Sequence, residues 1–117
     1  MIVEMRTYVL HPGRQAEFLS LMSAEGIKIE RPILGRLLGF YTSEIGMQNQ
    51  VIHLWGYESF EDRQIRRARL AANPEWTAFL PKVLPMIRDM RNQLLNPAPF
   101  ARTETLDWNG TNDASSS

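Results

Sequence analysis

Three stretches of the chain read as β-strands. Residues 2–10 alternate side chains with the period of two that an extended strand requires. Residues 36–45 are rich in aromatic and branched side chains, and residues 50–58 repeat the alternation most clearly. The turn of residues 46–49 between the last two is too short for anything but a hairpin. The pattern therefore predicts one strand, a long connection, and then a hairpin.

Helical spacing fills the two long connections. Residues 13–25 place apolar side chains three and four apart until Gly26 interrupts the pattern, and a second packed piece follows. In the second connection, Ser59 stands as the N-cap of a helix, because an acid lies three residues further on. Asn73 and Pro74 stop that helix and start another. Each connection is therefore predicted to contain two helical pieces.

A fourth strand at residues 86–95 completes the order, although the same stretch is also compatible with a helix. The order strand, helices, strand, hairpin, strand, helices, strand is that of the α+β ferredoxin-like split βαβ fold. This fold has a four-stranded antiparallel sheet with helices on one face. We assign the domain to residues 1–95, and we expect the polar residues 96–117 to form a mobile tail.

Such a two-layer fold leaves one sheet face without helices. The alternation divides the strand residues into two sets, and we expect the uncovered face to carry the set Glu4, Arg6, Tyr8, His53, Trp55 and Tyr57. That is too much aromatic surface to leave in water. A second copy packing sheet against sheet would bury it, so the chain is predicted to form a homodimer.

Composition excludes several kinds of chemistry. The 117 residues fit one domain, and the absence of cysteine excludes disulfides, thiol nucleophiles and thiolate metal sites. With two histidines, a multi-histidine metal centre is excluded as well, and we expect no cofactor. Thirteen basic and thirteen acidic side chains balance, which argues against nucleic acid or an anionic membrane as partner. No targeting segment or membrane span is visible, so we expect a cytoplasmic protein.

Three separated segments also resemble the NIPSNAP family: residues 4–13 (EMRTYVLHPG), 49–57 (NQVIHLWGY) and 74–76 (PEW). The resemblance covers about residues 1–95 and implies a ferredoxin-like domain that pairs into a dimeric α/β barrel. It implies less about function. Eukaryotic members are linked to vesicle traffic and mitochondrial quality control, and many short members have no assigned activity. Relatives of the same architecture include cofactor-free monooxygenases, isomerases and haem-degrading enzymes, a likeness of fold alone.

Candidate chemistry gathers on the first and third strands, which are neighbours in a ferredoxin-like sheet. We take His53, Arg6 and Tyr8 as candidate catalytic residues, with His53 as a base and Arg6 stabilising an enolate. The candidate ligand-binding set is Glu4, Arg6, Tyr8, Tyr41, His53, Trp55 and Tyr57. Two functions stay open: binding of a small, partly aromatic or acidic metabolite in a pocket formed by the sheet faces, or turnover by a cofactor-independent monooxygenase or isomerase. The structural alternative is an interface ion pair between Glu4 and Arg6 with a hydrogen-bonded interior histidine.

Two further assignments depend on details of placement. Tyr41 reaches the same cavity only in one register of its strand, because a one-residue slip exchanges it for Phe40 and Thr42. An arginine cluster lies on the helix that follows the hairpin, and we interpret it as a solvated helix face. Its members are Arg63, Arg66, Arg67 and Arg69.

Overall fold

The computed structural model describes residues 1–101, and the remaining residues of the predicted tail, 102–117, lie outside the described part. The strands are β1 (Ile2–Leu10), β2 (Arg36–Thr42), β3 (Gln50–Tyr57) and β4 (Ile87–Leu95). The α-helices are α1 (Gln15–Leu21), α2 (Ile27–Leu34), α3 (Phe60–Ala72) and α4 (Pro74–Val83). Three shorter pieces are η1 (Met22–Gly26), a π-helical turn, and the 3-10 turns η2 (Leu84–Met86) and η3 (Pro99–Ala101).

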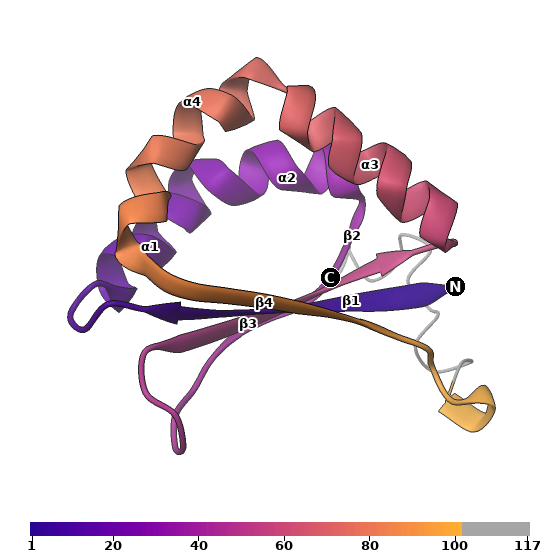
Figure 1. The fold of residues 1–117 in the computed structure, drawn as a ribbon, viewed down its shortest axis with the longest axis horizontal. Coiled ribbons are helices and arrows are strands. Elements are labelled where there is room, and N and C mark those ends of the chain that lie inside the picture. The colour runs from indigo at the N-terminus through magenta and orange to yellow at the C-terminus, as the bar shows by residue number, and fades with distance from the viewer. Residues whose placement is uncertain (102–117) are drawn as a thin grey trace.

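The four strands form one antiparallel sheet in the order β2-β3-β1-β4, and the helices form an arch over one side of it (Figure 1). This confirms the ferredoxin-like α+β fold, including the fourth strand. Among the described residues, no helix is both long and apolar enough to cross a membrane.

The helical segment is not broken at Gly26, where the sequence pattern predicted an interruption. The chain continues from α1 through the π-turn η1 into α2. Gly26 is required by packing, since a Cβ there would lie 2.7 Å from the Met22 sulfur and 3.0 Å from the Phe79 ring. The glycine therefore allows this helical segment and α4 to approach closely. Helix α2 ends at Leu34, and the φ of 95° at its C-cap Gly35 suits a residue without a side chain.

Strand β2 is shorter than predicted and ends at Thr42, so that residues 43–49 form the hairpin connection. Pairing with β3 shifts between Leu37 and Gly39, which marks a bulge. Beyond the bulge, Phe40 lies opposite His53, and Tyr41 lies opposite Ile52. The bulge thus fixes the register that the sequence left open.

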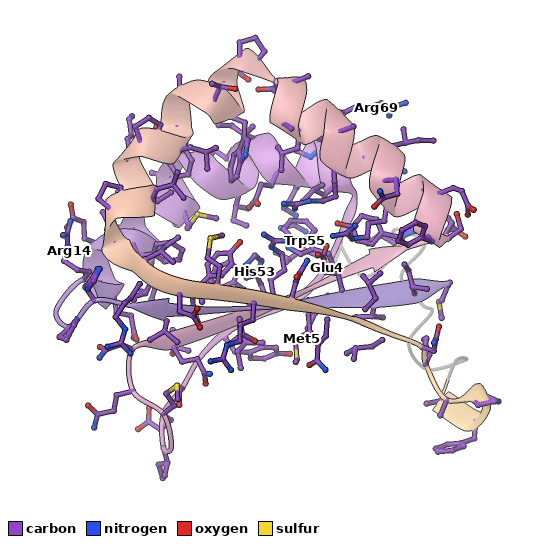
Figure 2. The ribbon with its side chains drawn as sticks, viewed as in Figure 1. Glu4, Met5, Arg14, His53, Trp55 and Arg69 are labelled. Carbon is purple, nitrogen blue, oxygen red and sulfur yellow. The ribbon has the colours of Figure 1, made fainter. Side chains whose placement is uncertain are left out.

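The prediction of the uncovered face is wrong. Glu4, His53 and Trp55 point toward the helices, whereas Met5 points away from them (Figure 2). Glu4 and Trp55 are fully buried, and His53 is 1% exposed. The helices of the same chain therefore cover the aromatic set. In β1 and β3 the open face carries the other set, which is mainly aliphatic, and in β4 it carries Asp89, Arg91, Gln93 and Leu95.

Candidate functional site

A cavity of about 220 Å³ lies between the sheet and the helices. At roughly 30 Å³ of liquid volume per water molecule, it has room for about seven waters. Much of its wall is apolar and includes Phe18, Met22, Trp76, Leu80, Val83 and Met90. Leu84 and Met90 are 44% and 45% exposed and lie at its opening beside β4. The cavity suits a small molecule with an apolar body.

Three residues that line the cavity each carry a buried polar atom without a hydrogen bond among the described residues. The atoms are Oε1 of Glu30, Nε2 of His53 and Nη1 of Arg67. Their side chains come from α2, β3 and α3. Buried polar groups are normally hydrogen-bonded, and each one left unsatisfied destabilises the fold. An apolar cavity whose lining residues include a few polar groups has the composition expected of a small-molecule site.

His53 is held as a neutral hydrogen-bond donor. The Trp55 indole N–H donates to its Nδ1 at 2.8 Å, and the Phe40 ring stacks on it at 4.8 Å between centroids. Because an indole can only donate, Nδ1 must be unprotonated and the proton of the neutral ring lies on Nε2. Burial, with the charges of Arg6 and Arg67, lowers the pKa of His53 to about 3. This arrangement makes His53 a donor toward the cavity, not the base expected from the sequence.

Glu30 is the group in this wall that can exchange a proton near neutral pH. It lies on α2 and is 3% exposed. Burial raises its pKa to about 7, although the charges of Arg67 and Arg6 act in the opposite direction. A carboxyl group with this pKa can accept and return a proton at physiological pH, which is the requirement for general acid–base catalysis.

Glu4 lies beside the cavity and joins four elements. Its Oε2 accepts from Arg6 at 3.0 Å, from Arg63 at 2.8 Å and from Asn92 at 2.9 Å. Its Oε1 accepts from the Tyr57 hydroxyl at 3.3 Å. Burial favours the neutral acid, yet the hydrogen bonds from Arg63 and Asn92 and the two guanidinium charges lower the pKa of Glu4 to about 2. Glu4 is therefore a permanently charged anchor.

Glu4 also orients Arg6 in the cavity wall. The Arg6 guanidinium bonds Glu4 through Nη1 and donates from Nε to the Tyr8 hydroxyl at 2.9 Å. Its carbon lies 5.6 Å from the centre of the Tyr8 ring, within cation–π range. The positive charge is thus fixed beside the cavity and held there by two partners.

The structure brings some of the sequence-predicted residues to the cavity and leaves others out. Arg6, Tyr8 and His53 line it. Three others are buried under the helices but do not line the cavity: Glu4, Trp55 and Tyr57. Trp55 donates to His53, and Tyr57 donates to Glu4. Tyr41 is 55% exposed and lies on the open face, where its ring covers Gly39.

The arginine cluster is not a uniformly solvated face, because two of its members turn inward. Arg63 binds Glu4, and Arg67 reaches the cavity. Arg66 pairs with Asp62 at 2.9 Å and donates to the Ile33 carbonyl, while Arg69 is exposed. Sequence reasoning missed Arg67 and Glu30. The available signal for Arg67 was its spacing of four from Arg63 and three from Leu70, which places all three on one helical face.

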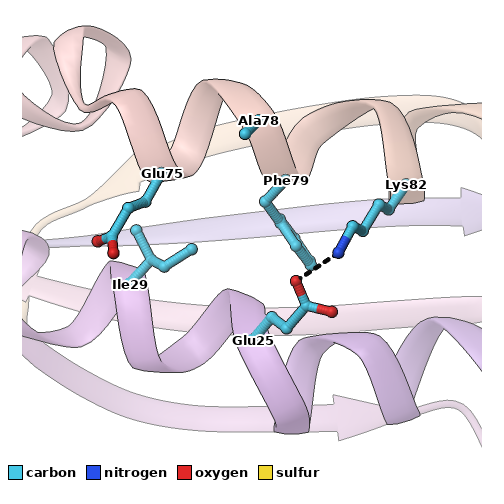
Figure 3. Close-up of a pocket in the computed structure, with 6 residues that line it drawn as sticks. All are labelled: Glu25, Ile29, Glu75, Ala78, Phe79 and Lys82. Carbon is cyan, nitrogen blue, oxygen red and sulfur yellow. Dashed lines mark hydrogen bonds and ion pairs between the residues drawn. The ribbon is translucent and has the colours of Figure 1, made fainter.

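A second hollow is a surface groove between the α2 and α4 segments (Figure 3). Glu25 and Lys82 form an ion pair of 2.7 Å across it, and Ile29 and Phe79 lie between the helices. None of the residues that line this groove carries a buried polar atom without a hydrogen bond, in contrast to the interior cavity. Within residues 1–101, no group of three or more potential ligands gathers to hold a metal ion.

Curated relatives match most of this chain. A NipSnap protein of Drosophila melanogaster is 32% identical over 103 residues, which are 88% of this chain and 37% of that protein. A NipSnap homolog of Dictyostelium discoideum is 33% identical over 80% of this chain and 41% of its own length. This chain therefore spans less than half the length of either relative.

Solved structures agree over nearly the full fold. An uncharacterized NIPSNAP-like domain protein from Burkholderia xenovorans is 49% identical, with a TM-score of 0.82 over 85% of this chain and 86% of that chain. An antibiotic biosynthesis monooxygenase is only 13% identical, with a TM-score of 0.59 over 85% of this chain and 100% of that one, so the two share the fold alone. The family model described as NIPSNAP matches residues 3–102, and with this agreement in sequence and structure the chain belongs to the NIPSNAP family.

Proposed function

We propose that this chain binds a small metabolite with an apolar body and a carbonyl or carboxylate oxygen in the cavity between sheet and helices. The observation that carries the proposal is the set of unpartnered atoms of Glu30, His53 and Arg67 around one cavity. A ligand oxygen that accepts from His53 and Arg67 removes two of these unsatisfied groups at once. The sequence pattern predicted a pocket formed by the sheet faces. The cavity instead favours a pocket between the sheet and the helices of a single chain.

Charge supports the choice of an oxygen acceptor. Two guanidiniums, of Arg6 and Arg67, lie in the wall beside one carboxyl group, that of Glu30. Arg6 shares the single charge of Glu4 with Arg63, and Arg67 forms no ion pair among the described residues. Tyr8 accepts from Arg6, so its own hydroxyl proton is available as a further donor. The wall thus offers donors to an oxygen, and its apolar residues accommodate an aliphatic or aromatic body.

Binding is tested by the thermal shift of the purified protein with phenylacetone, phenylpyruvate and benzoylacetone. These probes combine one aromatic ring with a ketone, a keto acid or a diketone. We expect at least one to raise Tm, because a ligand of the folded state stabilises it by mass action. With Leu84→Trp, at the cavity opening, we expect the same shift to require at least about tenfold more ligand. Phe60→Trp, exposed on α3 and outside the wall, is the control and keeps the wild-type shift. An unchanged wild-type Tm with all three probes contradicts the proposal.

We further propose that the chain forms a homodimer through the open sheet face. The aliphatic set there includes Met5, Leu54 and Ile52, with Tyr41 and Leu95 more exposed. The hairpin connection of residues 43–49 and the segment with η3 both extend on this side of the sheet (Figure 1). They carry Ile45 and Phe100, which are 93% and 87% exposed. A second copy seated on this face would bury these apolar groups together.

Light scattering at micromolar concentration tests the dimer. We expect twice the chain mass of 13.5 kDa for the wild type. Leu54→Lys places a charge on the open face of each copy and is expected to yield the monomer mass with an unchanged circular dichroism spectrum. Ile65→Lys introduces the same charge at an exposed position of α3 and should stay dimeric. A monomeric wild type contradicts the dimer and leaves the cavity proposal untouched.

A further inference from the structure

We infer that the cavity catalyses enolisation of a small ketone, with Glu30 moving the proton and with His53 and Arg67 binding the carbonyl oxygen. This inference rests on the proposed function and adds a reaction to the binding site. The starting point is the chemical difference among the three unpartnered atoms. Oε1 of Glu30 is an acceptor, whereas Nε2 of His53 and Nη1 of Arg67 are donors. Simple recognition of one oxygen needs only the donors.

The acceptor is informative because a carboxylate repels the same oxygen that the donors attract. Glu30 is nearly completely buried, and no cation among the described residues forms an ion pair with it. A group that only shaped the cavity would fit better as an apolar side chain or a paired acid. A base beside an acidic C–H bond explains the placement. The carbon next to a carbonyl carries such a bond, and the carbonyl oxygen is the acceptor that the two donors require.

The step balances without any oxidant or bound metal. The Glu30 carboxylate removes a proton from the carbon next to the carbonyl. The electron pair of the broken C–H bond forms the new C=C bond, and the π pair of the carbonyl moves to the oxygen, which gives the enolate. The Nε2–H of His53 and the Arg67 guanidinium donate to that oxygen as its charge develops. The proton on Glu30 exchanges with water in the cavity, and Glu30 then reprotonates the same carbon, or a conjugated one, in which case the ketone is isomerised.

Neighbouring groups from each packed element suit this step. Arg67 of α3 and Arg6 of β1 favour the negative enolate, and Tyr8 of β1 holds Arg6 in place. His53 of β3 stays neutral, because burial lowers its pKa, so it donates a proton in a hydrogen bond without giving it up. Glu30 is the only one of these groups whose pKa, about 7, lets it alternate between base and acid near neutral pH.

The test is deuterium exchange. Wild-type protein in D2O is incubated with phenylacetone, phenylpyruvate or benzoylacetone, and loss of the α-proton signal is followed by NMR against buffer. We expect exchange above buffer for a probe that also gives a thermal shift. Glu30→Gln should keep the thermal shift within a few fold and lower the exchange rate by roughly 10²–10⁴-fold. Glu17→Gln, an exposed glutamate of α1, is the control and keeps the wild-type rate.

The pH profile gives a second readout that needs no variant. The wild-type rate above buffer should rise with pH and level off above about 7, as Glu30 loses its proton. Binding without exchange above buffer overturns the enolisation and leaves the binding proposal intact. Equal exchange by the wild type and Glu30→Gln also overturns it. The absence of both binding and exchange overturns the proposed function itself.

Discussion

Replacing Glu4 by glutamine is expected to lower the free energy of unfolding by about 3–5 kcal/mol, because it leaves buried guanidinium groups without their counter-charge. Glu4 is fully buried, and the side chains of its partners Arg6 and Arg63 are only 13% and 15% exposed. The amide keeps the shape of the side chain but not its charge. Urea unfolding at pH 7 measures the difference.

The matched control is Glu17→Gln, which removes one partner of an exposed ion pair with Arg14. Exposed pairs contribute about 0–1 kcal/mol, so this variant should unfold close to the wild type. The Glu4 effect also has a defined pH range. The pKa of Glu4 falls from 4.5 to about 2 in the folded state, so its contribution is complete above 4.5 and is lost as the pH falls toward 2. A Glu4→Gln protein as stable as Glu17→Gln at pH 7 would show that Glu4 is no anchor.

The sequence was sufficient for the order of the elements because its signals are local, and the ferredoxin-like fold then makes the first and third strands neighbours. The register is an observation of the structure, which places Arg6 opposite His53 and Glu4 opposite Trp55. The six side chains expected on one face do share it. Turn residues and helix caps, such as Ser59 accepting from the Asp62 N–H, are equally local.

The same local signals do not determine which face of the sheet the helices cover. A period of two divides a strand into two sets of side chains but does not say which set faces the helices. In β3 both sets are apolar: Val51 and Trp55 on one side, Ile52 and Leu54 on the other. The deciding contacts are long-range, such as Arg63 of α3 reaching Glu4 of β1. The expected pocket was assigned to the uncovered face, whereas Arg6, Tyr8 and His53 line a cavity on the covered face.

The two charged residues missed at the site share one cause. Arg67 was grouped with its charged neighbours, and Glu30 lies among the apolar residues Ile27, Ile33 and Leu34 of α2. Composition favours a solvent-exposed position for a charged residue. Helical position is the better guide here, because Glu30 lies three residues after Ile27 and four before Leu34, on the side of the helix that is buried. A carboxyl group within an apolar stripe is the signal that sequence reading can use.

The burial of Glu30 should affect how the free energy of unfolding depends on pH, which can be measured without a ligand. Burial raises its pKa from 4.5 to about 7 in the folded protein. Between these pH values the folded state holds a proton that the unfolded state has lost, so Glu30 lowers stability progressively as the pH rises. At about 1.4 kcal/mol per pH unit, the full penalty above pH 7 is about 3 kcal/mol. Glutamine carries no charge at any pH and avoids this penalty.

We therefore expect the difference in unfolding free energy between Glu30→Gln and the wild type to shift by about 3 kcal/mol in favour of the variant from pH 4 to pH 8. The comparison is made by urea unfolding at unit steps of pH. Because both proteins contain His53, the comparison cancels its effect on stability. The fold lowers the pKa of His53 below its ordinary value of 6.5, so protonation of His53 favours unfolding as the pH falls. Glu17→Gln should run parallel to the wild type throughout. If the unfolding free energy of Glu30→Gln also runs parallel to that of the wild type, ionisation of Glu30 does not destabilise the folded protein. The argument for a base held unpaired in the cavity then fails.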